Sequence, residues 1–245
     1  MHLGRWDLQE PSYEPGAWLR GTIYPQRCDL SPDGRWFAYF AMKQSADWDL
    51  GATYIAISRL PWLTALAAWG IGSTWTRGMQ FAEDASVRDV DEPDLGDLSA
   101  VYERFGLRMS RADAFAVERR RGWTETADTP PRDPADAWDE RRGDRIAMEK
   151  PRPGSATERL TVRGTYAAIR ELHGIRTDVR YEIRREGEAA LEGVQWADWG
   201  PDGRLLAVTD DGRLQIRDGD SVAWEADEGS NEPDPAPPPE EASRW

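Results

Sequence analysis

Residues 28–40 read Cys-Asp-Leu-Ser-Pro-Asp-Gly-Arg-Trp-Phe-Ala-Tyr-Phe, and a related stretch at residues 197–209 reads Ala-Asp-Trp-Gly-Pro-Asp-Gly-Arg-Leu-Leu-Ala-Val-Thr. In each copy, proline presets φ for a tight turn, aspartate suits the next position and glycine adopts the left-handed conformation that closes it. An apolar run follows each turn. Each copy therefore predicts a strand, a turn and a strand buried on both faces.

Ten residues of these two copies are the structural residues that we single out. The aspartate before each turn is expected to hydrogen-bond turn amides, and the arginine after it to pair with nearby carboxylates. Because these residues are duplicated, they indicate a role in the scaffold, whereas a catalytic site would usually occur once. They are Asp29, Pro32, Asp33, Gly34, Arg35, Asp198, Pro201, Asp202, Gly203 and Arg204.

The second copy continues into a larger repeating unit. After a further Asp-Gly turn at 211–212, residues 213–217 alternate apolar and polar as a half-exposed strand does, and residues 221–225 can supply a fourth strand. The unit thus grades from buried inner strands to a wetter outer strand. One blade of a β-propeller requires this gradient.

The pattern of aspartate, Pro-Asp-Gly-Arg, two apolar residues and alanine resembles the blades of TolB-type, WD40-like β-propellers, over residues 22–57 and 194–225. Asp33 and Asp202 lie 169 positions apart, and such blades repeat about every 40–45 residues. The resemblance implies an all-β propeller of about five blades spanning residues 1–226. The N-terminal segment is expected to close the ring by pairing into the last blade.

Between residues 77 and 190 the blade pattern decays, so these inner blades are degenerate in sequence. Residues 101–109 and 114–119 predict strands, with a short helix as an alternative around residues 98–105. Residues 123–126 resemble an outer strand, and residues 127–144 a loop. Further strands are expected at residues 145–149, 159–162, 166–169 and 179–184.

From residue 227 to residue 245 the chain is acidic, rich in proline and almost devoid of apolar residues. Such a segment buries too little surface to offset its ordering entropy, so we expect a disordered tail. It would act as a solubilising tail or as a partner-binding tail.

The formal net charge of −14 argues against a nucleic-acid partner, which would need a basic surface. The uncharged run at residues 60–76 is too short and too broken by proline and glycine for a membrane span. Cys28, the single cysteine, is expected to be a buried inert thiol, and it excludes an internal disulfide. We expect a cytoplasmic monomer.

Few residues point to chemistry. His2 and His173 are the only histidines, and no nucleophile elbow or phosphate-binding glycine loop accompanies them. The acidic run at residues 83–97 lacks the spacing of a calcium loop. We therefore expect no catalytic, cofactor-binding or metal-ligating residues, and no cofactor.

Two functions stay open. The first is a non-enzymatic module that binds or scaffolds an unidentified protein partner, which the fold resemblance and the missing catalytic constellation favour. The alternative is a protein that binds or processes a small molecule or glycan, using carboxylates and tryptophan at the central mouth of the ring. The fold alone does not decide between them.

Overall fold

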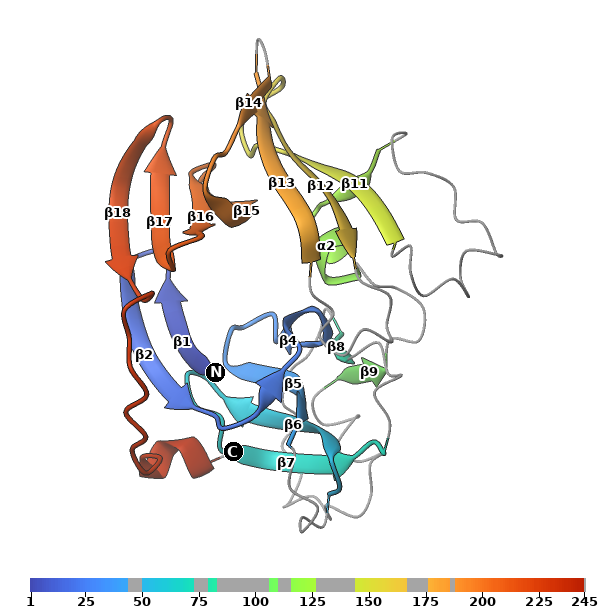
Figure 1. Cartoon of the computed structure of the whole chain (residues 1–245), viewed down its shortest axis with the longest axis vertical. Coiled ribbons are helices and arrows are strands. Elements are labelled where there is room, and N and C mark those ends of the chain that lie inside the picture. The colour runs from blue at the N-terminus through green and yellow to red at the C-terminus, as the bar shows by residue number, and fades with distance from the viewer. Residues whose placement is uncertain are drawn as a thin grey trace. The chain divides into compact units, whose positions relative to one another are not determined.

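Antiparallel strands make up most of the computed structural model, which describes residues 1–43, 50–72, 79–82, 106–109, 116–126, 144–166, 176–185 and 188–244. The described strands form several separate antiparallel sheets (Figure 1). The chain divides into two units: Met1–Trp6, Tyr13–Val117 and Pro233–Trp245 form the first, and Asp7–Ser12 and Glu118–Glu232 the second. The prediction of an all-β fold is confirmed.

The N-terminal segment folds back on itself. Strand β1 (His2–Asp7) pairs with β2 (Ser12–Trp18) in a sheet of two strands. The carboxylate of Asp7 accepts hydrogen bonds from the backbone N–H groups of Gln9 and Glu10, which tightens the turn between them. The described pairing of β1 is thus with its sequence neighbour, and not with the last strand of the chain as ring closure would require.

The first copy of the repeated turn lies in a sheet of the first unit. This β3–β7 sheet contains β3 (Thr22–Ile23), β4 (Asp29–Leu30), β5 (Trp36–Met42), β6 (Thr53–Arg59) and β7 (Ala65–Gly70). A 3-10 turn, η1 (Pro25–Arg27), connects β3 to β4. β4 pairs with β5 across the turn, as predicted, and β5 and β6 are buried along nearly their whole length.

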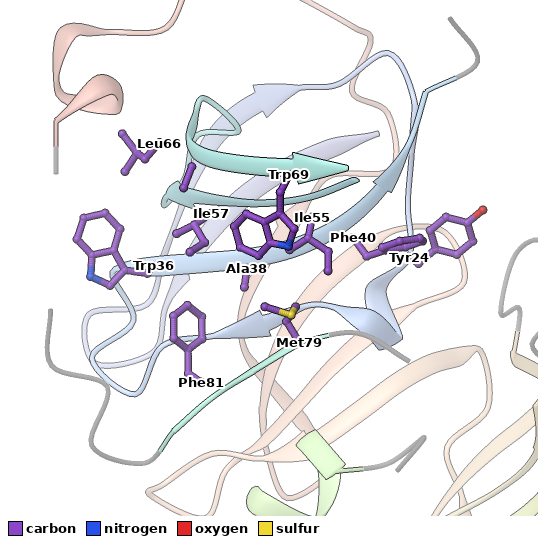
Figure 2. Packing of buried hydrophobic residues seen from close by; sticks show 11 residues of the cluster. Tyr24, Trp36, Ala38, Phe40, Ile55, Ile57, Leu66, Trp69, Met79 and Phe81 are labelled. Atoms are coloured by element: carbon purple, nitrogen blue, oxygen red, sulfur yellow. The ribbon is translucent and has the colours of Figure 1, made fainter. Parts of the chain in front are cut away.

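The core of this unit covers one face of the β3–β7 sheet. Buried side chains of β5, β6 and β7 pack there against Met79 and Phe81 of β8 (Met79–Phe81), as Figure 2 shows. β8 pairs with β9 (Leu107–Met109). A second cluster, which includes Tyr39, Tyr54 and Cys28, covers the opposite face. Both faces are covered, which explains why these strands have no polar side.

In the second unit, the β10–β14 sheet contains five strands in sequence order. They are β10 (Thr124–Glu125), β11 (Asp144–Pro151), β12 (Arg159–Tyr166), β13 (Arg176–Arg184) and β14 (Glu188–Ala190). The strands predicted at residues 145–149, 159–162 and 179–184 are confirmed. Residues 127–143 and 167–175, which include most of the expected loop, lie outside the described residues.

One strand prediction in this region is wrong. Residues 114–119 were expected to form a strand, but Ala116–Arg120 form the helix α2. Alanine, glutamate and arginine all favour a helix, and this preference outweighs the single valine. The helix ends at Arg120, and Gly122, two residues further on, has φ of +89°.

The β15–β18 sheet is a four-stranded meander that holds the second copy (Figure 1). Its strands are β15 (Val194–Trp199), β16 (Leu205–Thr209), β17 (Arg213–Asp218) and β18 (Ser221–Asp227). The expected fourth strand is present, and the strands grade from buried β15 and β16 to largely exposed β18.

The C-terminal segment differs in part from the expected disordered tail. β18 extends to Asp227, residues 228–239 are largely exposed without regular structure, and Glu240–Ser243 form a 3-10 turn, η3. η3 packs against β6, and Ala242 is fully buried there. A small apolar side chain that needs little space thus anchors a segment whose composition is otherwise polar.

Candidate functional site

The two repeated turns have the same geometry. The backbone N–H of Gly34 donates to the carbonyl oxygen of Ser31 at 2.8 Å, and that of Gly203 donates to the carbonyl oxygen of Gly200 at 3.0 Å. Both glycines have positive φ, +71° for Gly34 and +79° for Gly203. Pro32 and Pro201 occupy the second position of these turns, as the sequence predicts.

Arg35 and Arg204 fold back onto their own turns. Nε of Arg35 lies 2.6 Å from the carboxylate of Asp33, and Nε of Arg204 pairs in the same way with Asp202. Burial raises the pKa of Asp33, but hydrogen bonds from Ser31 and Arg35 outweigh it and hold this pKa below its usual value. Each of these two pairs closes its own turn.

Asp29 and Asp198 make longer-range contacts than expected. Asp29 accepts hydrogen bonds from the N–H groups of Leu30 at 2.8 Å and of Phe81, on β8, at 2.7 Å. Asp198 accepts from the N–H of Trp199 and from Nζ of Lys150, on β11. Both side chains are buried, and each bonds a group on another sheet. Both aspartates join two sheets of their own unit.

A different surface concentrates charge. On one face of the β10–β14 sheet, Arg159 of β12 stands directly opposite Arg184 of β13, and Arg163 stands opposite Arg180. Arg163, Arg180 and Arg184 are exposed and Arg159 is partly exposed. Side chains that face each other across two strands have Cβ atoms about 4.5–5.5 Å apart, and like charges there are destabilising. We call these four residues the arginine face.

Strand alternation explains how the arginine face forms. In β12, Leu160 and Val162 point into the core of the second unit, so Arg159, Thr161 and Arg163 point the other way. In β13, Tyr181 and Ile183 are buried, and Arg180, Glu182 and Arg184 occupy the opposite face. Trp123 packs edge-on against Tyr181 and completes the apolar side.

Acidic and hydroxyl groups lie between the two arginine pairs. Thr161 stands opposite Glu182 of β13 and opposite Glu149 of β11. A carboxylate oxygen of Glu149 lies 4.0 Å from Nε of Arg159. Oε2 of Glu182 is buried and has no hydrogen-bond donor within the part of the chain that the structure describes. A buried carboxylate oxygen without a donor is costly.

A hollow of ≈ 390 Å³ opens on the same face. Its lining includes two arginines, two glutamates and two threonines: Arg163, Arg184, Glu125, Glu149, Thr126 and Thr161. It contains none of the tryptophans. Of the nine tryptophans that the structure describes, four are buried, five are partly buried and none is fully exposed.

The arginine face was not predicted from the sequence. A signal was present, because Arg159 and Arg163 share the four-residue spacing of Arg180 and Arg184, and both pairs lie in alternating strands. The register that brings the pairs together was not predictable from that spacing. His173 and the acidic run at residues 83–97 lie outside the described residues.

Cys28 is buried, and its Sγ donates to the carbonyl oxygen of Tyr24 at 3.1 Å. Burial raises the pKa of this thiol to about 12. An inert buried thiol, as expected from the sequence, is therefore what the structure contains. Among the described residues, no three His, Cys, Asp or Glu side chains are grouped as metal ligands, and no helix is both long and apolar enough to cross a membrane.

Comparison with protein-family models, with curated proteins and with solved structures found no match to this chain.

Proposed function

We propose that this protein is a non-enzymatic protein-binding module, and that the arginine face is where it binds an acidic segment of its partner. The observation that carries the proposal is the register of β12 and β13, which places Arg159 opposite Arg184 and Arg163 opposite Arg180 on one face of the sheet. Four arginines gathered on one face of a sheet concentrate positive charge there, and this favours a role in binding. In a chain of net charge −14, a local basic surface supports a specific contact with acidic groups.

The proposed partner is a protein and not a nucleic acid. Glu149 and Glu182 lie between the arginine pairs, so a continuous phosphate backbone laid across the face would meet two carboxylates. Among the described residues, no aromatic side chain that could stack on a base lines the hollow on this face. The overall negative charge of the chain also opposes the approach of a polyanion.

We propose further that the sheets are blades of a TolB-type β-propeller with about five blades, in a cytoplasmic, monomeric protein. Support comes from the duplicated strand-turn-strand and from the four-stranded β15–β18 meander. A crystal structure tests this. The proposal requires the β3–β7 and β15–β18 sheets to be arranged around one axis, and an open arrangement would overturn it.

A second function, the binding of a small molecule or glycan, is favoured by the hollow itself. Its glutamates and threonines are the groups that hydrogen-bond hydroxyl-rich ligands. In this case a compact neutral ligand would occupy the hollow, and binding would depend on Glu149 more than on the exposed arginines.

A display selection distinguishes these functions. Random dodecapeptides are selected on the wild-type protein, on R180E/R184E and on the control R5E/R244E. The control makes the same change of charge at two exposed arginines that pair with Glu14 and Glu240. We expect acidic peptides to be enriched on the wild type and on the control, and to be lost on R180E/R184E.

Enrichment of peptides without acidic residues, or equal enrichment on R180E/R184E, would contradict the proposed docking surface. Binding of a single-stranded oligonucleotide in preference to every selected peptide would overturn the choice of a protein partner. A glycan-array signal that E149Q abolishes and R180E/R184E retains would instead support the small-molecule function.

A further inference from the structure

We infer that Asp218 and Gly219 form a site of spontaneous modification, at which the aspartate converts to isoaspartate. The backbone nitrogen of Gly219 attacks the side-chain carboxyl carbon of Asp218. A C–N bond forms, and the proton of the nitrogen leaves with the carboxyl hydroxyl as water, which gives a succinimide ring. Water then breaks the ring bond between this nitrogen and the former backbone carbonyl carbon. The main chain now runs through the side-chain carbon, and the former backbone carbonyl has become a carboxylate.

The chain offers four copies of this reaction for comparison. Aspartate is followed by glycine at residues 33–34, 202–203, 211–212 and 218–219. Because glycine has no side chain, its nitrogen is more accessible to the preceding carboxyl group than that of any other residue. All four steps lie within the described residues, so their contacts show which of them is held back from reacting.

Three of the four steps are restrained at both reacting groups. The N–H groups of Gly34, Gly203 and Gly212 each donate to the backbone carbonyl oxygen three residues earlier, at 2.8, 3.0 and 3.0 Å. The aspartate before each glycine pairs with Nε of the arginine that follows it. The nitrogen must lose its hydrogen bond and the carboxylate must leave its arginine before they can react, so both contacts oppose the reaction.

The step from Asp218 to Gly219 lacks both restraints. Asp220 stands after this glycine, where the other three steps have an arginine. Within the described part of the chain, the carboxylate of Asp218 has no hydrogen bond or ion pair and the N–H of Gly219 has no acceptor. Asp218 is also exposed, so water can reach the ring that opens. This step should therefore react first of the four.

The modification would fall in a turn with little room for a longer chain. Asp218 is the last residue of β17 and pairs with Ser221, the first residue of β18, so that only Gly219 and Asp220 form the turn. Isoaspartate adds a carbon atom to the main chain. Since the length of such a short loop fixes the register of its strands, we expect the extra atom to weaken the pairing of β18, the largely exposed edge of its sheet.

Ageing of the purified protein tests the inference. The protein is kept for several weeks at neutral pH and body temperature, both folded and unfolded in urea. Trypsin then places each Asp-Gly step on a peptide of its own, residues 28–35, 186–204, 205–213 and 218–244. A methyltransferase that recognises isoaspartate labels these peptides with a radioactive methyl group from S-adenosylmethionine.

For the folded protein, we expect at least about threefold more label on peptide 218–244 than on any other, because the other three steps must first give up a hydrogen bond. In urea all four peptides should be labelled to a similar extent. Asp218→Glu should remove the label from peptide 218–244, since glutamate would have to close a larger ring. Equal labelling of the four peptides from folded protein, or label that persists in Asp218→Glu, would overturn the inference.

Two asparagine variants form a matched pair for the role of the hydrogen bond. Asp218→Asn and Asp211→Asn each create an Asn-Gly step, which closes the same ring with loss of ammonia, and mass spectrometry follows this loss. We expect it to be at least about threefold faster in Asp218→Asn, because the N–H of Gly212 is bonded and that of Gly219 is not. A circular dichroism spectrum checks that both variants are folded. Equal rates would refute the role of the hydrogen bond and with it the choice of Asp218.

Discussion

Nζ of Lys150 donates a hydrogen bond to the carboxylate of Asp198 at 2.6 Å, and this ion pair connects β11 to β15 inside the second unit. The Asp198 side chain is 3% exposed and that of Lys150 is 14% exposed. We predict that Asp198→Asn lowers the free energy of unfolding by about 2–3 kcal/mol, because a largely buried ammonium group then lacks its counter-charge. Urea unfolding measures the change.

Two further variants test the reason for this loss. Lys150→Met combined with Asp198→Leu should recover a large part of it, since the buried charge is removed together with its partner. Asp220→Asn is the matched control, because Asp220 is 98% exposed beside Arg185. It should change stability by less than about 0.5 kcal/mol. A double variant no more stable than Asp198→Asn would contradict the explanation.

The two turn glycines should tolerate substitution unequally. Both have positive φ, so Gly34→Val and Gly203→Val should each cost about 1–3 kcal/mol. A Cβ added at Gly34 meets nothing within 4 Å, but one at Gly203 would lie 2.9 Å from the carbonyl oxygen of Pro153. Gly203→Ala should therefore lower Tm more than Gly34→Ala does. The Gly34→Ala variant measures the cost of the positive φ alone, because its added Cβ meets no other atom. Equal melting temperatures for the two alanine variants would contradict this prediction.

The ion pairs of Glu158 should make the free energy of unfolding depend on pH in the acidic range. A hydrogen bond from Arg152, and the charges of Arg152 and Arg185, hold the pKa of Glu158 below its usual 4.5, although burial raises it. Because the folded pKa is the lower one, the carboxylate stabilises the fold above pH 4.5, and this contribution is lost as pH falls through the folded pKa.

Glu158→Gln should therefore be less stable than the wild type by about 1–2 kcal/mol near neutral pH. The difference should shrink progressively below pH 4.5. Urea unfolding of both proteins across the acidic range measures it. If the difference in free energy of unfolding does not vary with pH, the substitution destabilises the fold through lost packing and not through the lost charge.

Cys28 should not react while the protein is folded. Cys28 is 8% exposed and its thiol has a pKa raised to about 12, so almost no thiolate exists at pH 8. Ellman's reagent should modify it only when urea unfolds the protein, with the same midpoint as the loss of circular dichroism. Rapid modification of the native protein would place Cys28 at the surface.

Reversing one charge on the arginine face should stabilise the fold while it weakens binding. Arg180→Glu places a carboxylate directly opposite Arg163 in the register of β12 and β13, and an attractive cross-strand pair is worth roughly 0.2–1 kcal/mol. The Tm of Arg180→Gln should fall between that of Arg180→Glu and that of the wild type. A higher Tm together with lost peptide binding would separate function from stability, whereas a lower Tm would indicate that Arg180 supports the fold.

Local patterns were enough to predict much of this fold. Proline, aspartate and glycine in order predicted both turns, and alternation predicted β13 and β17. The strand predicted at residues 114–119 was wrong because the segment is too short for its periodicity to distinguish a helix from a strand. Helix propensity decided the outcome there.

The candidate site was harder to predict because it depends on pairing between strands. Arg163 lies opposite Arg180 only in one register of β12 and β13, and shifting one strand by a single residue would turn its arginines to the other face. The Lys150–Asp198 pair likewise joins residues 48 positions apart. Neither relationship can be predicted from the local sequence around one of its residues.

The first unit takes residues from both ends of the chain, since Met1–Trp6 and Pro233–Trp245 both belong to it. During translation, its strands from β1 to β9 leave the ribosome before residues 118–232, and η3 follows only after these. Until then, the site on β6 that buries Ala242 is uncovered. A nascent chain would thus complete its second unit before its first.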